Sequence, residues 1–230
     1  MVGVGESDSH RCSARNAPEN NPSEDDGRLY SPVVARNFEP ICAALAPRLD
    51  AATGTVLEIG AGTGQPAALF SKRFSHLTWL PSDPDPAQLK SIAAWRSALG
   101  PPNLAEGIAL DATADWPALP PVRAMAPYHA IYASNVVHIA PWTVAEGIVA
   151  GAARVLAAGG VLIFYGPFAE GGCHTADSNA SFDRALRAKN PAWGVRDLNA
   201  ITALAKRAGF APPEIQRMPA NNLTVFFDYP

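Results

Sequence analysis

Thr55-Val56-Leu57-Glu58-Ile59-Gly60-Ala61-Gly62-Thr63-Gly64 is the stretch that decides the fold of this chain. Its first half, residues 55–59, is a nearly continuous apolar run, which is typical of a strand covered on both faces. The three glycines that follow allow a sharp turn and let a ligand approach the backbone closely. Pro66 suits the first turn of a helix, where its missing N–H matters little. The sequence therefore predicts a strand, a glycine turn and a helix, with Glu58 at the strand end where open α/β sheets bind ligands.

The spacing of the glycines separates the possible ligand classes. A dinucleotide fold uses G-x-G-x-x-G or G-x-G-x-x-A, but Gln65 stands at the third position here. A P-loop would need a Gly-Lys-Ser/Thr ending, which this run lacks. The pattern E-x-G-x-G-x-G instead resembles the first motif of class I S-adenosylmethionine (SAM)-dependent methyltransferases. That resemblance implies a cofactor-binding role for Glu58, Gly60, Gly62 and Gly64; glycines that serve turn geometry alone are the alternative.

Composition excludes several classes of function. The chain has 230 residues, of which 48% are hydrophobic and 17% charged, as expected of one globular domain. The net charge of −3 provides no basic surface for nucleic acid. No apolar run reaches the ~18 residues of a membrane span. The scattered Cys12, Cys42 and Cys173 match neither a disulfide framework nor a zinc pattern, so we expect no metal site and a reducing, cytoplasmic location.

The domain boundary is predicted near Gly27. Residues 1–27 are rich in Ser, Asn, Pro, Asp and Glu, so we expect a disordered tail, with a regulatory arm as the alternative. This segment lacks the apolar core of a signal peptide. Residues 28–230 are expected to form the single SAM-dependent methyltransferase domain.

An amphipathic helix is predicted ahead of the first strand. Ser31 can cap it, and apolar residues recur at helical spacing across 34–49. Pro40 falls inside this pattern and predicts a kink or a split. Because a helix in this position can cover a cofactor cleft, polar residues near its start are candidate cofactor contacts, with core packing or solvation as the alternatives: Tyr30, Arg36 and Asn37.

Aspartates follow the second and third predicted strands. Asp83 ends the strand at 77–82, where an acid can bind two ribose hydroxyls with its two carboxylate oxygens. Asp85 precedes Pro86 and is assigned to the N-cap of the next helix. Asp111, at the end of the third strand, is a candidate for binding the adenine, and a solvated turn aspartate is the alternative.

The fourth strand, 128–134, ends in a second informative stretch. Asn135 and His138 follow it and are close enough to share one turn. Polar side chains at the end of a central strand point into the cleft, so Asn135 is a candidate cofactor or catalytic residue. His138 is the candidate general base because its ordinary pKa lies near neutrality. A hydrogen-bonded wall of the pocket is the alternative for His138.

The last third of the chain predicts the substrate wall and the end of the sheet. A fifth strand at 161–165 leads into a polar loop, and such loops carry specificity in doubly wound folds. Strands at 214–218 and 223–228 are joined by a short connection, as in a hairpin. The predicted fold is therefore α/β, a single Rossmann-like doubly wound, mostly parallel sheet with a C-terminal antiparallel strand pair. The candidate substrate contacts are Tyr165, Phe168, His174, Asn179 and Trp142.

Longer motifs outside the glycine loop carry a closer resemblance. The motifs are Arg28-Leu29-Tyr30-Ser31-Pro32, Arg36-Asn37, Trp79-Leu80-Pro81-Ser82-Asp83-Pro84-Asp85, Ser134-Asn135-Val136-Val137-His138-Ile139, Tyr165-Gly166-Pro167-Phe168 and Pro219-Ala220-Asn221-Asn222-Leu223. In these motifs the chain resembles a small methyltransferase-like family that includes methyltransferase-like protein 26, over residues 28–228. The resemblance implies the class I methyltransferase fold and a cofactor role for the glycine-loop residues and Asp83. One departure is Pro66, where that family usually has a histidine or a similar residue.

The expected function is SAM-dependent methylation of a small, partly apolar molecule at oxygen, with S-adenosylhomocysteine (SAH) as product. Methyl transfer needs mainly positioning and, for a protonated acceptor, a base, so no catalytic serine or cysteine is required. No D/N-P-P-Y sequence follows the fourth strand, which disfavours methylation of nucleic acid or protein nitrogen. The alternatives are a non-catalytic SAM- or SAH-binding sensor or partner subunit, and a nicotinamide-dependent oxidoreductase, which Gln65 disfavours. Aminopropyl transfer would need an acidic pocket that the sequence does not indicate.

Overall fold

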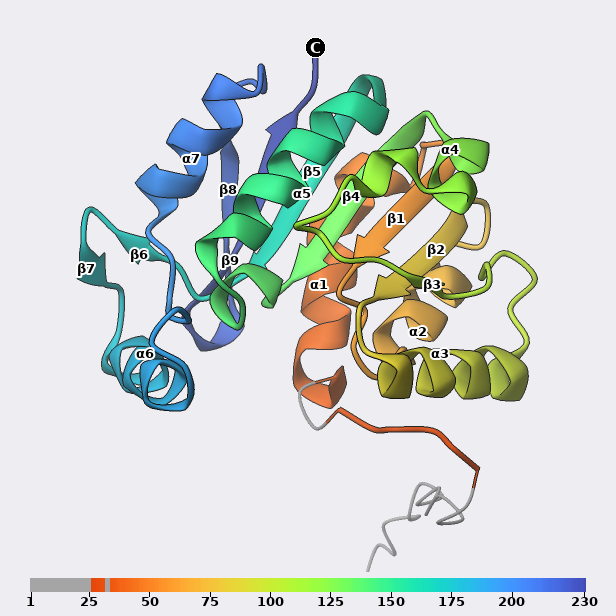
Figure 1. Ribbon diagram of the computed structural model, residues 1–230, viewed down its shortest axis with the longest axis horizontal. Coiled ribbons are helices and arrows are strands. Elements are labelled where there is room, and N and C mark those ends of the chain that lie inside the picture. The colour runs from red at the N-terminus through yellow and green to blue at the C-terminus, as the bar shows by residue number, and fades with distance from the viewer. Residues whose placement is uncertain (1–25, 32–33) are drawn as a thin grey trace, which may run out of the picture.

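The structure is a computed structural model that describes residues 26–31 and 34–230 (Figure 1). The predicted tail, residues 1–27, lies outside this range except for Asp26 and Gly27. Seven strands form one sheet in the order β3-β2-β1-β4-β5-β9-β8. The strands from β1 to β5 pair in parallel, whereas β9 is antiparallel to both β5 and β8. The predicted α/β fold, a doubly wound sheet closed by an antiparallel pair, is confirmed.

A second, two-stranded antiparallel sheet follows β5 in the chain. The strands of both sheets are β1 (Thr55–Ile59), β2 (Thr78–Asp83), β3 (Ile108–Ala109), β4 (Tyr128–Ser134), β5 (Leu156–Gly166), β6 (Ala169–Glu170), β7 (Cys173–His174), β8 (Glu214–Met218) and β9 (Asn222–Asp228).

Helices cover both faces of the large sheet. α1, α2 and α3 pack against one face, and α5 and α7 pack against the other (Figure 1). Short 3-10 helices span Trp116–Ala118, Val136–His138 and Pro219–Asn221. The α-helices are α1 (Val34–Leu49), α2 (Gln65–Arg73), α3 (Pro86–Leu99), α4 (Pro120–Met125), α5 (Trp142–Val155), α6 (Asp177–Lys189) and α7 (Leu198–Arg207).

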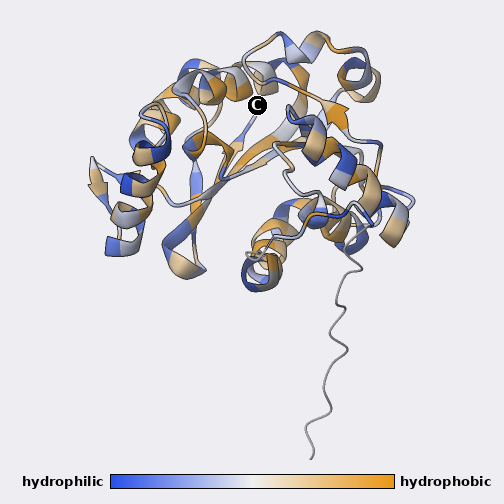
Figure 2. Ribbon diagram, turned by 60° about the horizontal axis from the view of Figure 1, so that its bottom comes forward, coloured by the Kyte–Doolittle hydropathy of each residue, from blue (hydrophilic) through white to orange (hydrophobic). Residues whose placement is uncertain are grey.

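The central strands are apolar on both faces because each face carries its own core. Along β4, Ala130 and Tyr132 belong to the core under α1 and α2, while Ile131 and Ala133 belong to the core under α5 and α7. Figure 2 shows the central strands as mainly hydrophobic and the helices around them as a mixture of hydrophobic and hydrophilic residues. This double burial is the reason that the strands read as continuous apolar runs rather than as alternating ones.

The first helix is not split. α1 runs from Val34 to Leu49 as one helix, although Pro40 and Pro47 lie inside it. Pro40 has no N–H to donate, so one turn of the helix lacks a backbone hydrogen bond. Burial of Ile41, Leu45 and Leu49 against the sheet offsets this loss.

A tight contact joins α5 to the segment after β3. The indole of Trp116 is buried, and its Nε1 donates to the carbonyl of Gly147 at 3.0 Å. A Cβ at Gly151 would lie 2.2 Å from the Trp116 ring. Glycine in the middle of a helix is normally unfavourable, so close packing accounts for its presence in α5.

We expect Gly151→Ala to destabilise the protein by about 1–3 kcal/mol, because the added methyl overpacks the Trp116 site. Urea unfolding measures the change. The control is Ala150→Gly, on the exposed side of the same helix, which should lose about 1 kcal/mol or less. A Gly151→Ala variant that gained stability, as helix propensity alone predicts, would contradict the packing argument.

Candidate functional site

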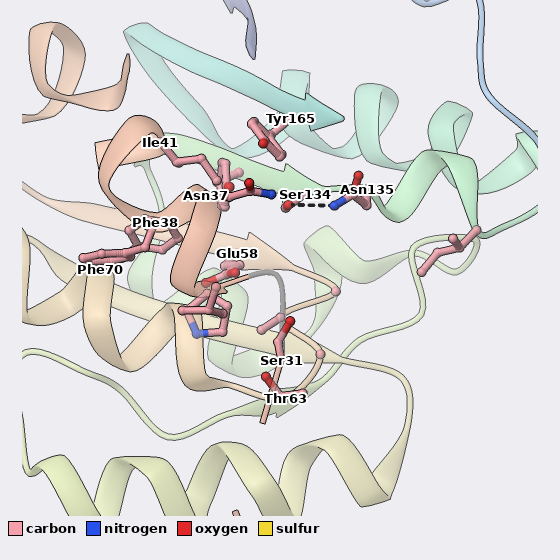
Figure 3. A pocket seen from close by; sticks show the side chains of 17 residues that line it. Ser31, Asn37, Phe38, Ile41, Glu58, Thr63, Phe70, Ser134, Asn135 and Tyr165 are labelled. Atoms are coloured by element: carbon pink, nitrogen blue, oxygen red, sulfur yellow. Dashed lines mark hydrogen bonds between the residues drawn. The ribbon is translucent and has the colours of Figure 1, made fainter. Parts of the chain in front are cut away.

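A cavity of about 250 Å³ opens at the carboxyl ends of β1, β4 and β5, beneath the start of α1 (Figure 3). The strand order reverses between β1 and β4, and open α/β sheets bind ligands at such a switch point. α1 contributes an apolar wall together with one amide side chain. The residues that line the pocket include, from α1, Val34, Asn37, Phe38 and Ile41; from the glycine loop, Gly60 to Thr63; and from the strand ends, Glu58, Tyr132, Ser134, Asn135 and Tyr165.

The glycine loop has a backbone that other residues adopt rarely. Gly60, Gly62 and Gly64 have φ angles of 70°, 55° and 76°. A Cβ at Gly60 would meet the Val136 side chain at 2.5 Å, and one at Gly64 would meet the Ile92 backbone at 2.6 Å. A Cβ at Gly62 would meet nothing within 4 Å. The outer two glycines therefore allow close packing, and the middle one leaves the loop open toward the pocket.

Asp83 holds this loop in place. Its side chain is buried, and one carboxylate oxygen accepts the N–H of Gly62 at 2.9 Å while the other accepts the N–H of Asp85 at 2.9 Å. Burial raises the pKa of Asp83, and the two backbone hydrogen bonds oppose that shift. Asp85 caps α3 by accepting the N–H of Ala87 at 2.8 Å, as predicted for it.

Glu58 is a buried acid at the end of β1. The indole N–H of Trp79 donates to one of its oxygens at 2.7 Å. Burial raises the pKa of Glu58 to about 7, the charge of Asp83 adds to the rise, and the Trp79 hydrogen bond opposes it. The pocket therefore contains a carboxyl group that changes charge near neutral pH.

Tyr132 is a pocket residue that the sequence analysis did not single out. It lies opposite Glu58 in the register of β1 and β4, its side chain is buried, and its hydroxyl has no hydrogen-bond partner in the described part of the chain. Burial is the main reason that its pKa is raised well above the ordinary value. The usable signal was strand periodicity, because Tyr132 lies two residues before Ser134 and faces the same side.

The structure separates the two residues predicted after β4. Asn135 has a φ of 60° and lines the pocket. His138 is fully buried, its Nδ1 accepts the backbone N–H of Arg196 at 3.1 Å, and its ring packs edge-on against Phe168 at 4.8 Å. Burial lowers the pKa of His138 to about 3, so the ring is neutral. His138 does not line the pocket, so these contacts favour a structural, hydrogen-bonded role in the core over the base role, which stays a prediction.

The other predicted cofactor contacts lie in different places. Asn37 lines the pocket, whereas Arg36 is exposed on α1. Tyr30 packs against Trp95 of α3, with ring centroids 4.9 Å apart. Asp111 is exposed and accepts the backbone N–H and the hydroxyl of Thr113; the side-chain hydrogen bond is the main cause of its lowered pKa.

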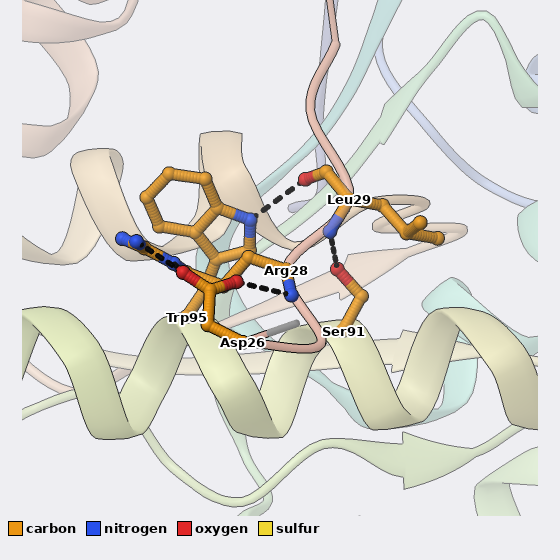
Figure 4. A network of polar contacts seen from close by, with 5 residues as sticks. All are labelled: Asp26, Arg28, Leu29, Ser91 and Trp95. Carbon is orange, nitrogen blue, oxygen red and sulfur yellow. Dashed lines mark hydrogen bonds and ion pairs between the residues drawn. The ribbon is translucent and has the colours of Figure 1, made fainter. Parts of the chain in front are cut away.

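An extended segment ahead of α1 lies across α3 (Figure 4). The N–H of Leu29 donates to the hydroxyl of Ser91, which in turn donates to the carbonyl of Thr63 in the glycine loop. The indole of Trp95 donates to the carbonyl of Leu29 at 2.8 Å. Tyr30 therefore lies on a segment that is tied to the glycine loop through Ser91, and the next residue, Ser31, lines the pocket.

Among the predicted substrate contacts, Tyr165 alone lines the pocket. Phe168 is buried beneath it, against His138. Asn179 joins α6 to the β8–β9 connection by donating to the carbonyl of Asn221 at 3.0 Å. His174 is exposed on β7, and Trp142 lies at the start of α5.

Residues 26–31 and 34–230 contain no group of three histidine, cysteine, aspartate or glutamate side chains arranged to hold a metal ion. Within the same range, no helix has the length and apolar character needed to cross a bilayer.

The sheet order, the closing hairpin and the glycine loop together define the class I methyltransferase fold. The chain belongs to the family described as "Protein of unknown function (DUF938)", whose model matches residues 28–229. That description assigns no activity, so the resemblance to the family of methyltransferase-like protein 26 stays a prediction.

Proteins of solved structure share this fold at low sequence identity. An O-methyltransferase family protein from Burkholderia thailandensis matches with a TM-score of 0.72 and 15% identity, over 85% of this chain and 57% of that one. Human N-acetylserotonin methyltransferase in complex with SAM matches with a TM-score of 0.65 and 12% identity, over 86% of this chain and 52% of that one. The structure of PigF with SAH matches with a TM-score of 0.68 and 15% identity, over 85% of this chain and 56% of that one. This chain spans little more than half the length of these proteins, and the likeness concerns the fold.

We expect Glu58→Gln to change the pH dependence of stability. Because the folded-state pKa of Glu58 lies above its unfolded value of 4.5, its favourable contribution is fully present below pH 4.5 and is lost as pH rises through about 7. Glutamine does not titrate and can still accept from Trp79. The stability of the variant relative to wild type should therefore grow by up to about 3 kcal/mol between pH 4.5 and pH 8.

Chemical denaturation across that pH range measures this difference. Glu146→Gln, an exposed acid on α5, is the control and should stay within about 0.5 kcal/mol of wild type throughout. A constant difference between Glu58→Gln and wild type would show that burial does not perturb Glu58.

Proposed function

We propose that this protein is a SAM-dependent methyltransferase that acts on a small, partly apolar molecule at an oxygen atom. The observation that carries the proposal is the glycine loop, which lines a pocket at the switch point of the sheet. Asp83 accepts the N–H of Gly62 in this loop, and the space around Gly62 is open. A ligand with a sugar and a polar tail can lie along such a loop, because backbone and carboxylate groups face it.

The residues present fit that cofactor. Asp83 can accept hydroxyl hydrogen bonds beside the backbone N–H groups that it already accepts, since each carboxylate oxygen has two lone pairs. The Thr63 hydroxyl is buried at the loop without a partner among the described residues, and Glu58 can pair with a cationic group. When bound, SAM supplies a methyl group activated by its positive sulfonium.

The chain's own residues would act mainly by positioning and by excluding water. α1 covers the pocket with Phe38 and Ile41, and Phe70 of α2 lies beside them, so an apolar body is favoured. Ser134 and Tyr165 present hydroxyl groups at the opposite end, which suits an oxygen-bearing acceptor. Holding two reactants in a fixed geometry can account for several kcal/mol of barrier reduction.

The solved structures that share the fold support the class of reaction, since they include methyltransferases and complexes with SAM and SAH. Because this chain spans little more than half of their length, we argue its acceptor from its own pocket. The low net charge favours a small molecule over nucleic acid. The free thiols of Cys42 and Cys173 are consistent with a reducing compartment, and on that ground we propose the cytoplasm.

A non-catalytic SAM or SAH sensor is the second candidate. The burial of His138 favours it, because burial lowers the pKa of His138 to about 3, which makes the ring a weak base, and the ring does not line the pocket. A nicotinamide-dependent oxidoreductase is disfavoured by Gln65 at the third glycine position and by the antiparallel pair that closes the sheet.

We expect micromolar binding of SAH and SAM, and none of NAD, in parallel calorimetric titrations. Asp83→Asn should weaken SAH binding about 10- to 100-fold, because charged hydrogen bonds to the loop and to the ligand are lost together. Asp85→Asn is the matched control, since asparagine caps helices as well as aspartate does. Selective binding of NAD would overturn the proposal.

We expect His138→Ala to act on stability more than on catalysis. Removing a buried, hydrogen-bonded ring should cost on the order of 1–3 kcal/mol, whereas His174→Ala, at an exposed site, should cost little. SAH release in the presence of a mixture of small phenols and alcohols measures turnover. A more than hundredfold loss of kcat in a folded His138→Ala protein would restore the base role.

A further inference from the structure

Two segments that are far apart in the sequence meet at the β5 end of the pocket. Tyr165, near the end of β5, is buried and lines the pocket. Asn222, the first residue of β9, places its Nδ2 3.1 Å from the Tyr165 hydroxyl oxygen. The antiparallel register of β5 and β9 brings them together, because Tyr165 lies opposite Thr224.

A second contact fixes the orientation of the Asn222 amide. Its Nδ2 also lies 3.2 Å from the backbone carbonyl oxygen of Pro219. A carbonyl oxygen can only accept, so the amide group that faces it must be the nitrogen. The two hydrogens of that nitrogen are then used for Pro219 and for Tyr165. The phenol oxygen of Tyr165 therefore accepts from Asn222, and its own hydrogen is free to donate elsewhere.

The ionisable side chains that line the pocket decide what the Tyr165 hydroxyl hydrogen can meet there. Burial raises the pKa values of Tyr165 and Tyr132, so both phenols keep their protons at neutral pH. The Tyr132 hydroxyl is buried and without a partner among the described residues. Glu58, on β1, is the one carboxyl group among the described lining residues, which include no lysine, arginine or histidine. Tyr132 lies opposite Glu58, whereas Tyr165 lies on β5, which β4 separates from β1, so the β5 end of the pocket presents a phenol and no charged side chain.

We propose that Asn222 is a positioning residue that sets the Tyr165 hydroxyl as a donor to an oxygen atom of the ligand. This inference rests on the proposed function. The oxygen belongs either to the carboxylate of the cofactor or to the methyl acceptor. In both cases the site selects a group with lone pairs and disfavours an ammonium group at this end.

Asn222→Asp reverses the polarity with little change in size. A carboxylate cannot donate, so it accepts the Tyr165 hydrogen, and the phenol then presents its lone pairs to the pocket. Tyr165→Phe removes the hydroxyl altogether. The matched control is Asn221→Asp, which adds the same charge one residue away, at an exposed position whose side chain contacts Ser178.

The probes are SAH alone, and benzoate or benzylammonium titrated into SAH-saturated protein by calorimetry. We expect Tyr165→Phe to weaken binding of SAH or of benzoate about 3- to 10-fold, as for loss of one hydrogen bond. Asn222→Asp should weaken binding of the same probe at least as much, and should raise the affinity for benzylammonium relative to that for benzoate. In the Tyr165→Phe background, Asn222→Asp should cause no further change in affinity.

The outcomes separate the two sources of oxygen. Weaker SAH binding assigns the donor to the cofactor carboxylate, and weaker benzoate binding with unchanged SAH assigns it to the acceptor. If both variants bind both probes as Asn221→Asp does, the proposal is overturned. Benzoate that does not bind, together with unchanged SAH affinity, overturns it as well.

A separate measurement distinguishes failure of this inference from failure of the proposed function. If wild type binds no SAH, the proposed function fails. Tyrosine labelled with ¹³C at Cζ still reports the Tyr165 titration by NMR, and Asn222→Asp should raise that pKa because a donor is replaced by a negative charge. A Tyr165 pKa that Asn222→Asp leaves unchanged would show that Asn222 does not set the polarity of the phenol.

Discussion

The hydrogen bond from the Gly62 N–H to the Asp83 carboxylate is the contact on which the site depends. It joins the end of β2 to the loop after β1, and so fixes a backbone that only glycine adopts readily. The dependence is mutual, because a buried carboxylate without donors would be strongly unfavourable. The position of the loop in turn sets the opening of the pocket and the start of α2, where Gly64 lies against α3. One side chain therefore links the topology of the sheet to the shape of the ligand site.

The parts of the fold that the sequence predicts are those that depend on local chemistry. The runs at 55–59 and 128–134 are apolar because both faces of each strand are covered, and this was readable without knowing what covers them. The glycine loop and the Asp85 cap follow from backbone geometry within a few residues. The antiparallel end of the sheet follows from two short strands and the turn between them. Features that depend on tertiary packing could not be predicted in this way. One example is α1, which stays a single helix across Pro40 because its buried face packs against the sheet.

Where sequence and structure differ at the site, the difference depends on contacts between distant segments. His138 follows a strand end, as a base would, but the backbone of Arg196 and the ring of Phe168 enclose it. The sequence within a few residues of His138 does not predict these contacts. Tyr132 and Asn222 were not among the predicted site residues for a similar reason, since one lies within a strand and the other in the short connection between two strands. Their roles appear only when β4, β5 and β9 are placed side by side in register.

Burial explains why the pocket combines these groups. A carboxyl group and two phenols on adjacent strand ends would keep ordinary pKa values in water, but under α1 their charged forms are disfavoured. The phenols are neutral at physiological pH in any case, and burial moves their pKa values further from it, whereas burial moves the pKa of Glu58 to about 7, where a nearby cation can change its charge. An acid buried in this way reduces the stability of the fold above neutral pH, and the two apolar cores on either side of the sheet offset that loss. The switch point of the sheet is where such a cluster can be both enclosed and open to a ligand, because the loops after β1 and β4 diverge there.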